Sequence, residues 1–225
     1  MKTRFFLLMM LLLVAALGSA CGPQPLPSPA DPDPTAAEPG SALFSDDFSN
    51  ASNPSAWGLW SGQGAVVEYH SGGLRILVQE PQYDFWSVPG RSFTDVQIET
   101  DAVKLGGPDD NDFGLICRYQ NEDNFYMLVI SSDGYYGIAK LKDGQYSLLG
   151  ADELQFSSAI AQGQAANNIR ADCIGPTLRL YANGVPLAEV QDSDFASGDV
   201  GLIAGSYSTP GVDILFDNFM VRKPE

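Results

Sequence analysis

The chain has 225 residues, of which 28 are acidic and 12 are Lys or Arg, giving a formal net charge of −16 at pH 7. Nucleic-acid binding depends on clustered basic side chains that neutralise phosphates, so this composition argues against a nucleic-acid partner. His70 is the single histidine, which excludes a metal site built from several imidazoles. Its position beside a Ser-Gly-Gly turn favours a turn residue over a catalytic base.

Residues 1–20 have the pattern of a secretory signal peptide. Two basic residues precede an unbroken apolar run from Phe5 to Leu17, and small residues follow it. The run has 13 residues, whereas a membrane-spanning helix needs about 20. We therefore predict that the chain is exported.

Cys21 follows those small residues directly. This arrangement resembles the lipobox of bacterial lipoproteins, although Gly18 stands where that family usually has Leu. The resemblance implies that the Cys21 thiol is acylated, that the signal is removed, and that a lipid bilayer of the cell envelope holds the protein on its extracytoplasmic side. Ordinary signal cleavage that leaves a free cysteine and an uncleaved anchor are the alternatives.

Residues 21–42 are predicted to be a linker. Between Gly22 and Gly40 lie seven of the chain's 15 prolines and three acids, with no base and no apolar periodicity. Proline favours extended backbone, so these 19 residues would reach up to ~60 Å. We interpret the segment as a stalk, and a disordered N-terminus of no particular length is the alternative.

Residues 43–225 are predicted to form one all-β domain, an antiparallel β-sandwich of the jelly-roll type. Between Val96 and Ala102, apolar or β-branched residues alternate with polar ones, as in a half-buried strand. Short β-like runs separated by Gly, Asn and Asp turns continue to the end of the chain. Three consecutive runs, 113–119, 124–131 and 135–141, predict a meander. Only Ala151–Gln162 is a candidate for a short helix.

Two cysteines remain if Cys21 is acylated. Cys117 and Cys173 each lie in a β-like run, and an even pair in an oxidising compartment predicts a disulfide. Closing the long loop between them would stabilise the fold by about 4 kcal/mol in the chain-entropy model. Two separate buried thiols are the alternative.

Four segments between residues 43 and 221 follow one another in a distinctive order. They are Phe44–Phe48 with Trp57, Asp112–Tyr119 running into Asp123–Tyr126, Asn168–Arg170 with Cys173 and Leu178–Gly184, and Gly198–Ile203 ending in Phe216–Val221. Together they resemble the concanavalin A-like lectin/glucanase jelly roll, most closely its laminin-G-like and 3-keto-disaccharide hydrolase-like bacterial branch. The resemblance implies two curved sheets, adjacent first and last strands, and carbohydrate bound on the concave face. Lectins, glycosidases and adhesion modules share this fold.

The carboxylates of the glucanase mechanism are incomplete in this chain. Retaining glycosidases use two carboxylates about 5 Å apart, which the glucanase family supplies as Glu-x-Asp-x-Glu or Glu-x-Asp-x-x-Glu on one strand. Here Glu99 and Asp101 match the first two positions, but Val103 or Lys104 occupies the third. We therefore assign no catalytic residue and favour a non-enzymatic, lectin-like module. A glycan hydrolase of the 3-keto-disaccharide type and a structural or adhesion module are the alternatives.

Aromatic residues are the better indication of a binding site, because the C–H face of a sugar stacks on a ring while polar side chains bind its hydroxyls. The abundant aromatics include Tyr135, Tyr146 and Tyr207. By strand parity we expect Arg118 and Glu99 to face outward on neighbouring strands of one sheet. The predicted groove comprises these two, Tyr126 and Lys140 beside them, and Tyr83, Phe85 and Trp86 in a loop at the sheet edge. Packing in the core or rim is the alternative for each aromatic.

No cofactor is predicted, apart from two weak candidates for a structural calcium ion. The first is the acidic loop with Asp109, Asp110 and Asp112, because Ca²⁺ takes six to eight oxygen ligands. Its spacing does not follow the EF-hand pattern, so a solvated turn is favoured. The second set comprises Asp46, Asp47 and Asp217.

Overall fold

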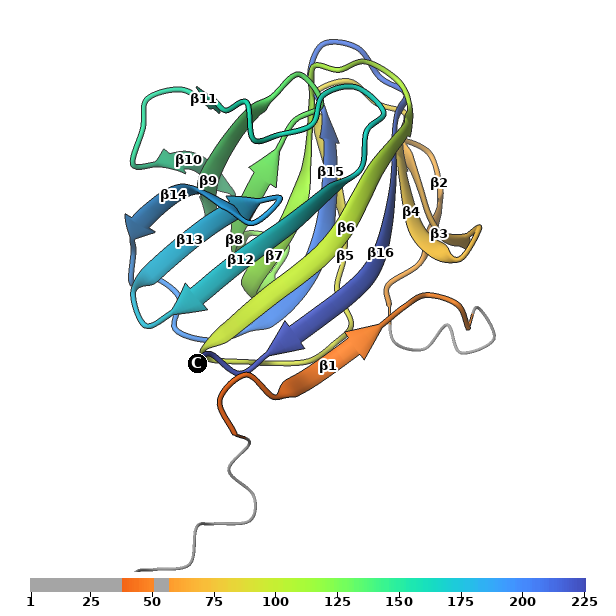
Figure 1. The fold of residues 1–225 in the computed structure, drawn as a ribbon. Helices are drawn as coiled ribbons and strands as arrows, with labels where there is room; N and C mark the ends of the chain where they lie inside the picture. The colour runs from red at the N-terminus through yellow and green to blue at the C-terminus, as the bar shows by residue number, and fades with distance from the viewer. Residues whose placement is uncertain (1–37, 51–56) are drawn as a thin grey trace, which may run out of the picture. The chain divides into compact units, whose positions relative to one another are not determined.

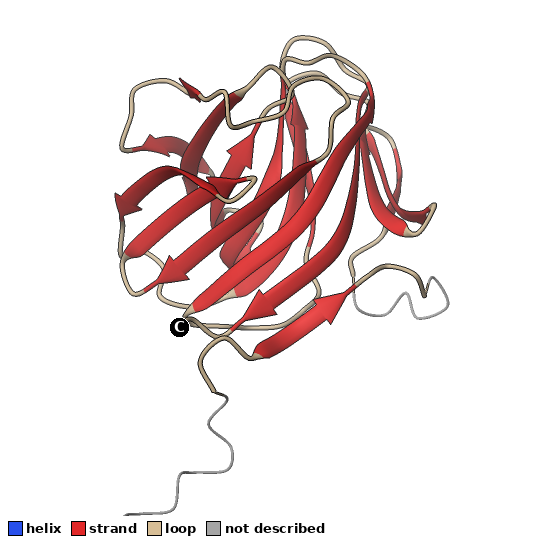
Figure 2. Ribbon diagram, viewed as in Figure 1, coloured by secondary structure: helices blue, strands red, loops and turns tan. Residues whose placement is uncertain are grey.

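The computed structural model describes residues 38–50 and 57–225. In these ranges the chain forms 16 strands, which assemble into two antiparallel sheets that face each other (Figures 1 and 2). The predicted all-β sandwich is therefore confirmed. The signal peptide 1–20, the lipidated Cys21 and most of the linker 21–42 lie outside the described residues.

The first sheet has the order β14-β13-β12-β6-β16-β4-β3-β2, and β1 pairs with β16. The first and last described strands are therefore adjacent, as the resemblance to the jelly roll implied. The strands of this sheet are β1 (Ala42–Asp46), β2 (Trp60–Gly62), β3 (Ala65–His70), β4 (Gly73–Val78), β6 (Val96–Gly106), β12 (Asn167–Ile174), β13 (Thr177–Ala182), β14 (Val185–Gln191) and β16 (Val212–Arg222).

The second sheet has the order β10-β9-β8-β7-β15-β5, and β11 pairs with β9. Its central strands β7, β8 and β9 are consecutive in the chain, which confirms the predicted meander. The strands of this sheet are β5 (Tyr83–Ser87), β7 (Asn111–Asn121), β8 (Asn124–Ile130), β9 (Tyr135–Lys142), β10 (Gln145–Leu149), β11 (Gln155–Phe156) and β15 (Asp199–Ser206).

The main core fills the space between the two sheets. On β6, residues from Val96 to Lys104 alternate between buried and half-buried, as the sequence pattern predicted. The disulfide between Cys117 and Cys173 is present and joins β7 of the second sheet to β12 of the first. The predicted pairing is confirmed, and the bond links the two layers through the core.

The helix predicted at Ala151–Gln162 is wrong. The segment forms turns and the short strand β11, which pairs with Tyr135 and Tyr136 of β9. Within it only Ile160 is fully buried, so a helix would have had no apolar stripe to place against the core. Figure 2 shows strands and loops throughout the described ranges, and these ranges contain no helix long and apolar enough to cross a membrane.

Candidate functional site

The second sheet buries apolar side chains on both of its faces. Tyr126 and Leu128 of β8 point into the main core, whereas Phe125 and Met127 point to the opposite, outer face. We call the buried residues of that face the outer cluster. It comprises Ile116, Phe125, Met127, Val129, Ala139 and Ile203, with Trp86, Tyr119, Leu141 and Leu148 packed against it.

A cavity of about 670 Å³ opens beside the outer cluster. Leu148 belongs to both, and Tyr146 lies two residues earlier on the same face of β10. Tyr146 is 57% exposed and Tyr135 is 41% exposed, so their rings are accessible to a ligand. We call this hollow the tyrosine cavity. Its lining residues are Asp110, Ser131, Asp133, Tyr135, Tyr146, Leu148, Asp152, Glu153, Leu154 and Tyr207.

Two carboxyl groups face each other close to the tyrosine cavity. Gly205 of β15 pairs with Asp84 of β5 on one side and with Asp112 of β7 on the other. A Cβ atom at Gly205 would collide with a carboxylate oxygen of each aspartate, so any larger residue would displace the two carboxyl groups. Asp84 shares the face of Trp86, and Asp112 shares the face of Ile116. The pair therefore lies on the outer face of the second sheet.

Burial dominates the chemistry of this acid pair. Asp112 is only 9% exposed, and its Oδ1 has no hydrogen-bond partner. Burial first, and then the neighbouring charge of Asp84, raises the pKa of Asp112 to about 8. Burial also raises the pKa of Asp84 to about 6. Since both shifts favour the protonated form, the pair holds at least one proton at neutral pH.

Tyr207 and Tyr146 connect the acid pair to the cavity wall. Tyr207 lines the cavity, and after burial the nearby Asp112 carboxyl contributes to raising the pKa of its hydroxyl. Although the Tyr146 ring is exposed, desolvation of its hydroxyl, followed by the charges of Asp112 and Asp84, raises the pKa of Tyr146 to about 12. The pKa of Tyr207 is also raised, chiefly by burial. Both hydroxyls therefore remain protonated at neutral pH and can donate to a ligand.

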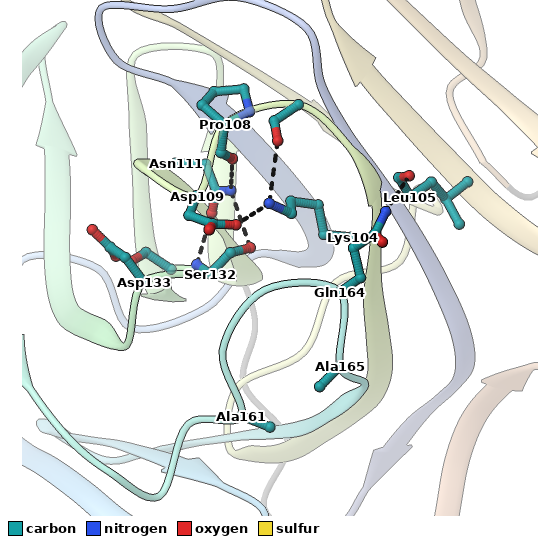
Figure 3. Close-up of polar contacts among 12 residues, drawn as sticks. Lys104, Leu105, Pro108, Asp109, Asn111, Ser132, Asp133, Ala161, Gln164 and Ala165 are labelled. Carbon is teal, nitrogen blue, oxygen red and sulfur yellow. Dashed lines mark hydrogen bonds and ion pairs between the residues drawn. The ribbon is translucent and has the colours of Figure 1, made fainter.

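A network of polar contacts holds the loop that carries Asp110 (Figure 3). The ammonium group of the buried Lys104 pairs with Asp109 and donates to the carbonyl oxygen of Gly107 at 3.2 Å. Asn111 donates through its Nδ2 to Pro108 O at 2.7 Å and to Ser132 Oγ at 3.0 Å. These contacts join the loop before β7 to the β8–β9 turn.

The same turn places Asp133 at the cavity. Ser132 donates its backbone N–H to Asn111 Oδ1 at 3.0 Å, so the turn and the loop are bonded in both directions. Gln164, in the loop between β11 and β12, donates through its Nε2 to Leu105 O at 2.8 Å (Figure 3). This bond attaches that loop to β6 beside Lys104. The cavity rim near Asp110 is therefore supported by buried polar contacts.

The two predicted calcium sets do not converge. Asp109 pairs with Lys104, Asp110 lines the cavity, and Asp112 is buried on β7. In the second set, Asp46 accepts hydrogen bonds from Phe48 N at 2.8 Å and from Trp57 Nε1 at 3.0 Å. Among the residues that the structure describes, no three His, Cys, Asp or Glu side chains group together as a metal site would require.

Arg118 and Glu99 do not share a sheet, so that expectation is wrong. Glu99 lies on β6 of the first sheet and Arg118 on β7 of the second. Arg118 is 2% exposed, and its guanidinium donates to Phe195 O at 2.8 Å and to Gly175 O at 2.6 Å. The β7–β8 register shifts after Cys117 and Arg118 has a φ of 55°, so simple alternation no longer gives the direction of its side chain.

Tyr126 and Lys140 take part in a separate network. The Tyr126 ring is fully buried, and its hydroxyl donates to Asp192 Oδ1 at 2.5 Å. It also accepts from Phe195 N at 3.1 Å, while Lys140 pairs with Asp192 and Asp194. These contacts fix the segment before β15, and neither residue lines the tyrosine cavity.

The remaining predicted groove residues lie on β5, an edge strand, and not in a loop. Phe85 packs against the main core and stacks on Tyr83, with ring centroids 5.7 Å apart. Trp86 points the other way and contacts Phe125 of the outer cluster at 5.2 Å. Among the seven residues of the predicted groove, only Trp86 packs against the outer cluster, and none lines the cavity.

The sequence prediction missed Asp84 as part of the site. Asp84 sits between two predicted groove residues, but its partner Asp112 is brought to it only through β15. Tyr135, Tyr146 and Tyr207 belong to the aromatic set singled out in the sequence, although they were not placed in the groove.

Comparison with solved structures identifies proteins of similar fold. No protein-family model and no curated protein matches the sequence. Among solved structures, the carbohydrate-binding module CBM66 from Bacillus subtilis aligns with a TM-score of 0.61 at 16% identity, over 75% of this chain and 96% of that one. A B. subtilis protein of unknown function with a galectin-like fold gives 0.59 at 13% identity, over 83% and 97%.

A third neighbour belongs to an enzyme. The xylan β-1,4-xylosidase from Bacillus halodurans C-125 gives a TM-score of 0.56 at 16% identity, over 87% of this chain but only 41% of that one. At such identities the likeness shows the fold alone. The chain has a lectin-like β-sandwich fold of the kind found in carbohydrate-binding modules and in parts of glycoside hydrolases.

Proposed function

We propose that the protein binds carbohydrate in the tyrosine cavity without cleaving it. The observation that carries this proposal is the accessible tyrosine surface beside hydrogen-bonding groups in one hollow of about 670 Å³. Small-ligand sites typically have volumes of about 300–1,000 Å³ and combine an apolar lining with a few placed polar groups. The fold shared with a carbohydrate-binding module over 96% of that module supports the proposal.

The side chains of the cavity match the two needs of a sugar. Tyr135 and Tyr146 offer ring faces on which the C–H face of a pyranose stacks. The carboxylates of Asp152 and Glu153 accept hydrogen bonds from hydroxyls, and the hydroxyl of Tyr207 both donates and accepts. The supported loop and turn at the rim pre-organise the site, which lowers the entropic cost of binding.

Glycan hydrolysis is the second candidate, and the Asp84–Asp112 pair is the observation in its favour. A retaining glycosidase holds its two carboxyl groups about 5–5.5 Å apart, and an inverting one holds them further apart. Here both carboxylates crowd the Cβ position of Gly205, so they lie closer together than either mechanism needs. Asp112 is also buried. Binding is therefore the function that the geometry favours.

We also propose that the domain is tethered. In this account residues 1–20 are a signal peptide, Cys21 carries lipid, residues 21–42 form the stalk, and residues 43–225 form the displayed domain of an envelope protein. The lipobox-like sequence supports the anchor, and the proline-rich composition supports the stalk. Mass spectrometry of the N-terminal peptide from expressing bacteria should find acylated Cys21, and the change Cys21→Ser should release the protein from membranes. An unmodified N-terminal Cys21 would contradict the tether.

The binding proposal is tested with the full-length chain in an uncharged detergent that has no sugar headgroup. Retention on a glycan array should be lost in Tyr146→Ala, because the change removes a ring of the cavity. The matched control is Tyr83→Ala, which removes a ring of similar exposure on the other face of the sheet. Retention that is equal in Tyr146→Ala and the wild type would overturn the assignment of the site. Release of shorter sugars would identify the hydrolase instead, and absence of any retained glycan would favour an adhesion module.

A further inference from the structure

The lining of the tyrosine cavity has one sign of charge. Four of its residues are acidic, namely Asp110, Asp133, Asp152 and Glu153, and none is Lys, Arg or His. Among the described residues, none of these four forms an ion pair with a basic side chain. Elsewhere in the domain acids of the same type are paired, as Asp213 is with Arg75. The cavity therefore gathers four acidic side chains whose charge no neighbouring base neutralises.

The acid pair lies behind the cavity wall and leaves a hydrogen-bonding group there without a partner. Asp112 is 91% buried with a free Oδ1, and its carboxyl contributes, after burial, to the raised pKa of Tyr207, which lines the cavity. Asp84 stands across Gly205 from it. A buried acceptor without a partner is costly for a fold. Such a group favours a ligand that brings hydrogen-bond donors to this side of the cavity.

We propose that the cavity selects a glycan with free, protonated amino groups, such as a polymer of glucosamine. This inference rests on the proposed carbohydrate function and specifies its ligand. An ammonium group gives charge-assisted hydrogen bonds to carboxylates and is attracted by the face of a tyrosine ring. A uronic acid would meet only like charge, which disfavours it. A neutral sugar would leave the carboxylates of the cavity without a counter-charge.

A metal ion explains the acidic lining less well. Calcium needs six to eight oxygens converging on one point. No three acidic side chains of the described ranges are grouped in that way. Separate carboxylates around a hollow instead suit a ligand that presents several donors at different places, as an amino-sugar chain does.

The test compares two ligands that differ only at nitrogen. Titration calorimetry uses the full-length chain in the same detergent with EDTA present, at about pH 5.5, where exposed carboxylates are ionised. The ligands are a glucosamine oligomer and its N-acetylated form of equal length. We expect the free amine to bind at least about tenfold more tightly, and the preference to shrink as salt screens the charges. Equal or tighter binding of the N-acetylated form overturns the inference but leaves the proposed function standing.

A charge-removing variant supplies the second arm. Asp152→Asn/Glu153→Gln keeps the shape of the cavity and removes two charges, so it should reduce the affinity for the free amine about tenfold and leave the N-acetylated oligomer unchanged. Glu122→Gln, an exposed acid outside the cavity, is the matched control and should change neither. Equal weakening for both ligands would overturn the inference. If neither oligomer nor any glycan on the array binds, the proposed function fails together with it.

Discussion

On the outer face of the first sheet, Asp213 and Asp172 are each paired with an arginine on the same or a neighbouring strand. Arg75 donates two hydrogen bonds of 2.8 Å to Asp213, and Arg170 donates two of 2.7 Å to Asp172. On the outer face of the second sheet, Asp84 and Asp112 lie side by side with no basic partner. The aspartates on the first face are ion-paired, whereas the two on the second face are not.

The difference shows which face is available for a ligand. Where each carboxylate already has a guanidinium, the charges neutralise each other and the surface needs only water around it. Where acidic side chains are unpaired and lie beside exposed tyrosines, as in the lining of the tyrosine cavity, the surface keeps a negative potential and unused hydrogen-bond acceptors. Unpaired acids beside exposed tyrosines therefore identify the candidate site more clearly than the number of acids does.

The largest expected effect concerns the pH dependence of stability. The unfolded chain releases the Asp112 proton near its ordinary pKa of 3.8, whereas the folded protein holds it to about pH 8. The wild-type free energy of unfolding should therefore fall as the pH rises from about 4 to about 8. Asp112→Asn should remove most of this pH-dependent loss of stability. The part that remains comes from Asp84 and should be complete near pH 6, the raised pKa of that residue.

Urea unfolding at several pH values measures this effect. The control on the first sheet is Asp101→Asn, a carboxylate that accepts hydrogen bonds from Asn168 and Asn218. It should keep the fall in stability. A pH profile of Asp112→Asn that runs parallel to the wild-type profile would show that Asp112 titrates normally.

A second prediction concerns Arg118, which the structure places in the interior. Arg118→Met should destabilise the fold by about 2–3 kcal/mol, because the carbonyl oxygens of Phe195 and Gly175 lose a charged donor. Glycan retention by the folded fraction should stay at the wild-type level. If Arg118→Met remains fully folded but no longer retains glycan, Arg118 would belong to the binding site after all.

A smaller effect is expected at Gly205. Gly205→Ala should cost about 1–3 kcal/mol, because the added methyl group forces the carboxyl groups of Asp84 and Asp112 apart. The matched change on the first sheet is Gly106→Ala, where the nearest atom to the new Cβ is Asp213 Cβ at an ordinary 3.9 Å. Thermal unfolding of the two variants compares the faces directly. Equal stability of both would mean that the acid pair is not packed around Gly205.

The smallest effect should come from breaking a charge pair on the first sheet. Arg75→Met removes the hydrogen bonds to the partly buried Asp213 and to the more exposed Glu68, which should cost about 1 kcal/mol. Added salt should reduce the difference between variant and wild type in urea unfolding. A loss of several kcal/mol would show that the paired face contributes more to stability than its exposure implies.

Local patterns in the sequence were sufficient for much of the fold. The alternation along β6 gave the correct inward face, because one side of that strand packs on the core and the other meets solvent. The meander of β7, β8 and β9 followed from short runs separated by tight turns. The pairing of Cys117 with Cys173 followed from the count of cysteines and the expected compartment.

The site depended on features that no local pattern contains. The strands β6 and β7 are consecutive in the chain but belong to different sheets, so the parity argument that joined Glu99 to Arg118 had no basis. The irregular register after Cys117 then turned Arg118 into the interior. Asp84 and Asp112 meet because β15 lies between β5 and β7, a pairing of segments far apart in the sequence.

The most direct test of the account is a crystal structure of the protein with a bound amino-sugar oligomer. We predict that a sugar ring stacks on Tyr146 in the tyrosine cavity, on the outer face of the second sheet, with an amino group within hydrogen-bond distance of Asp152 or Glu153. A sugar bound instead on the paired-charge face of the first sheet, with the tyrosine cavity empty, would contradict it.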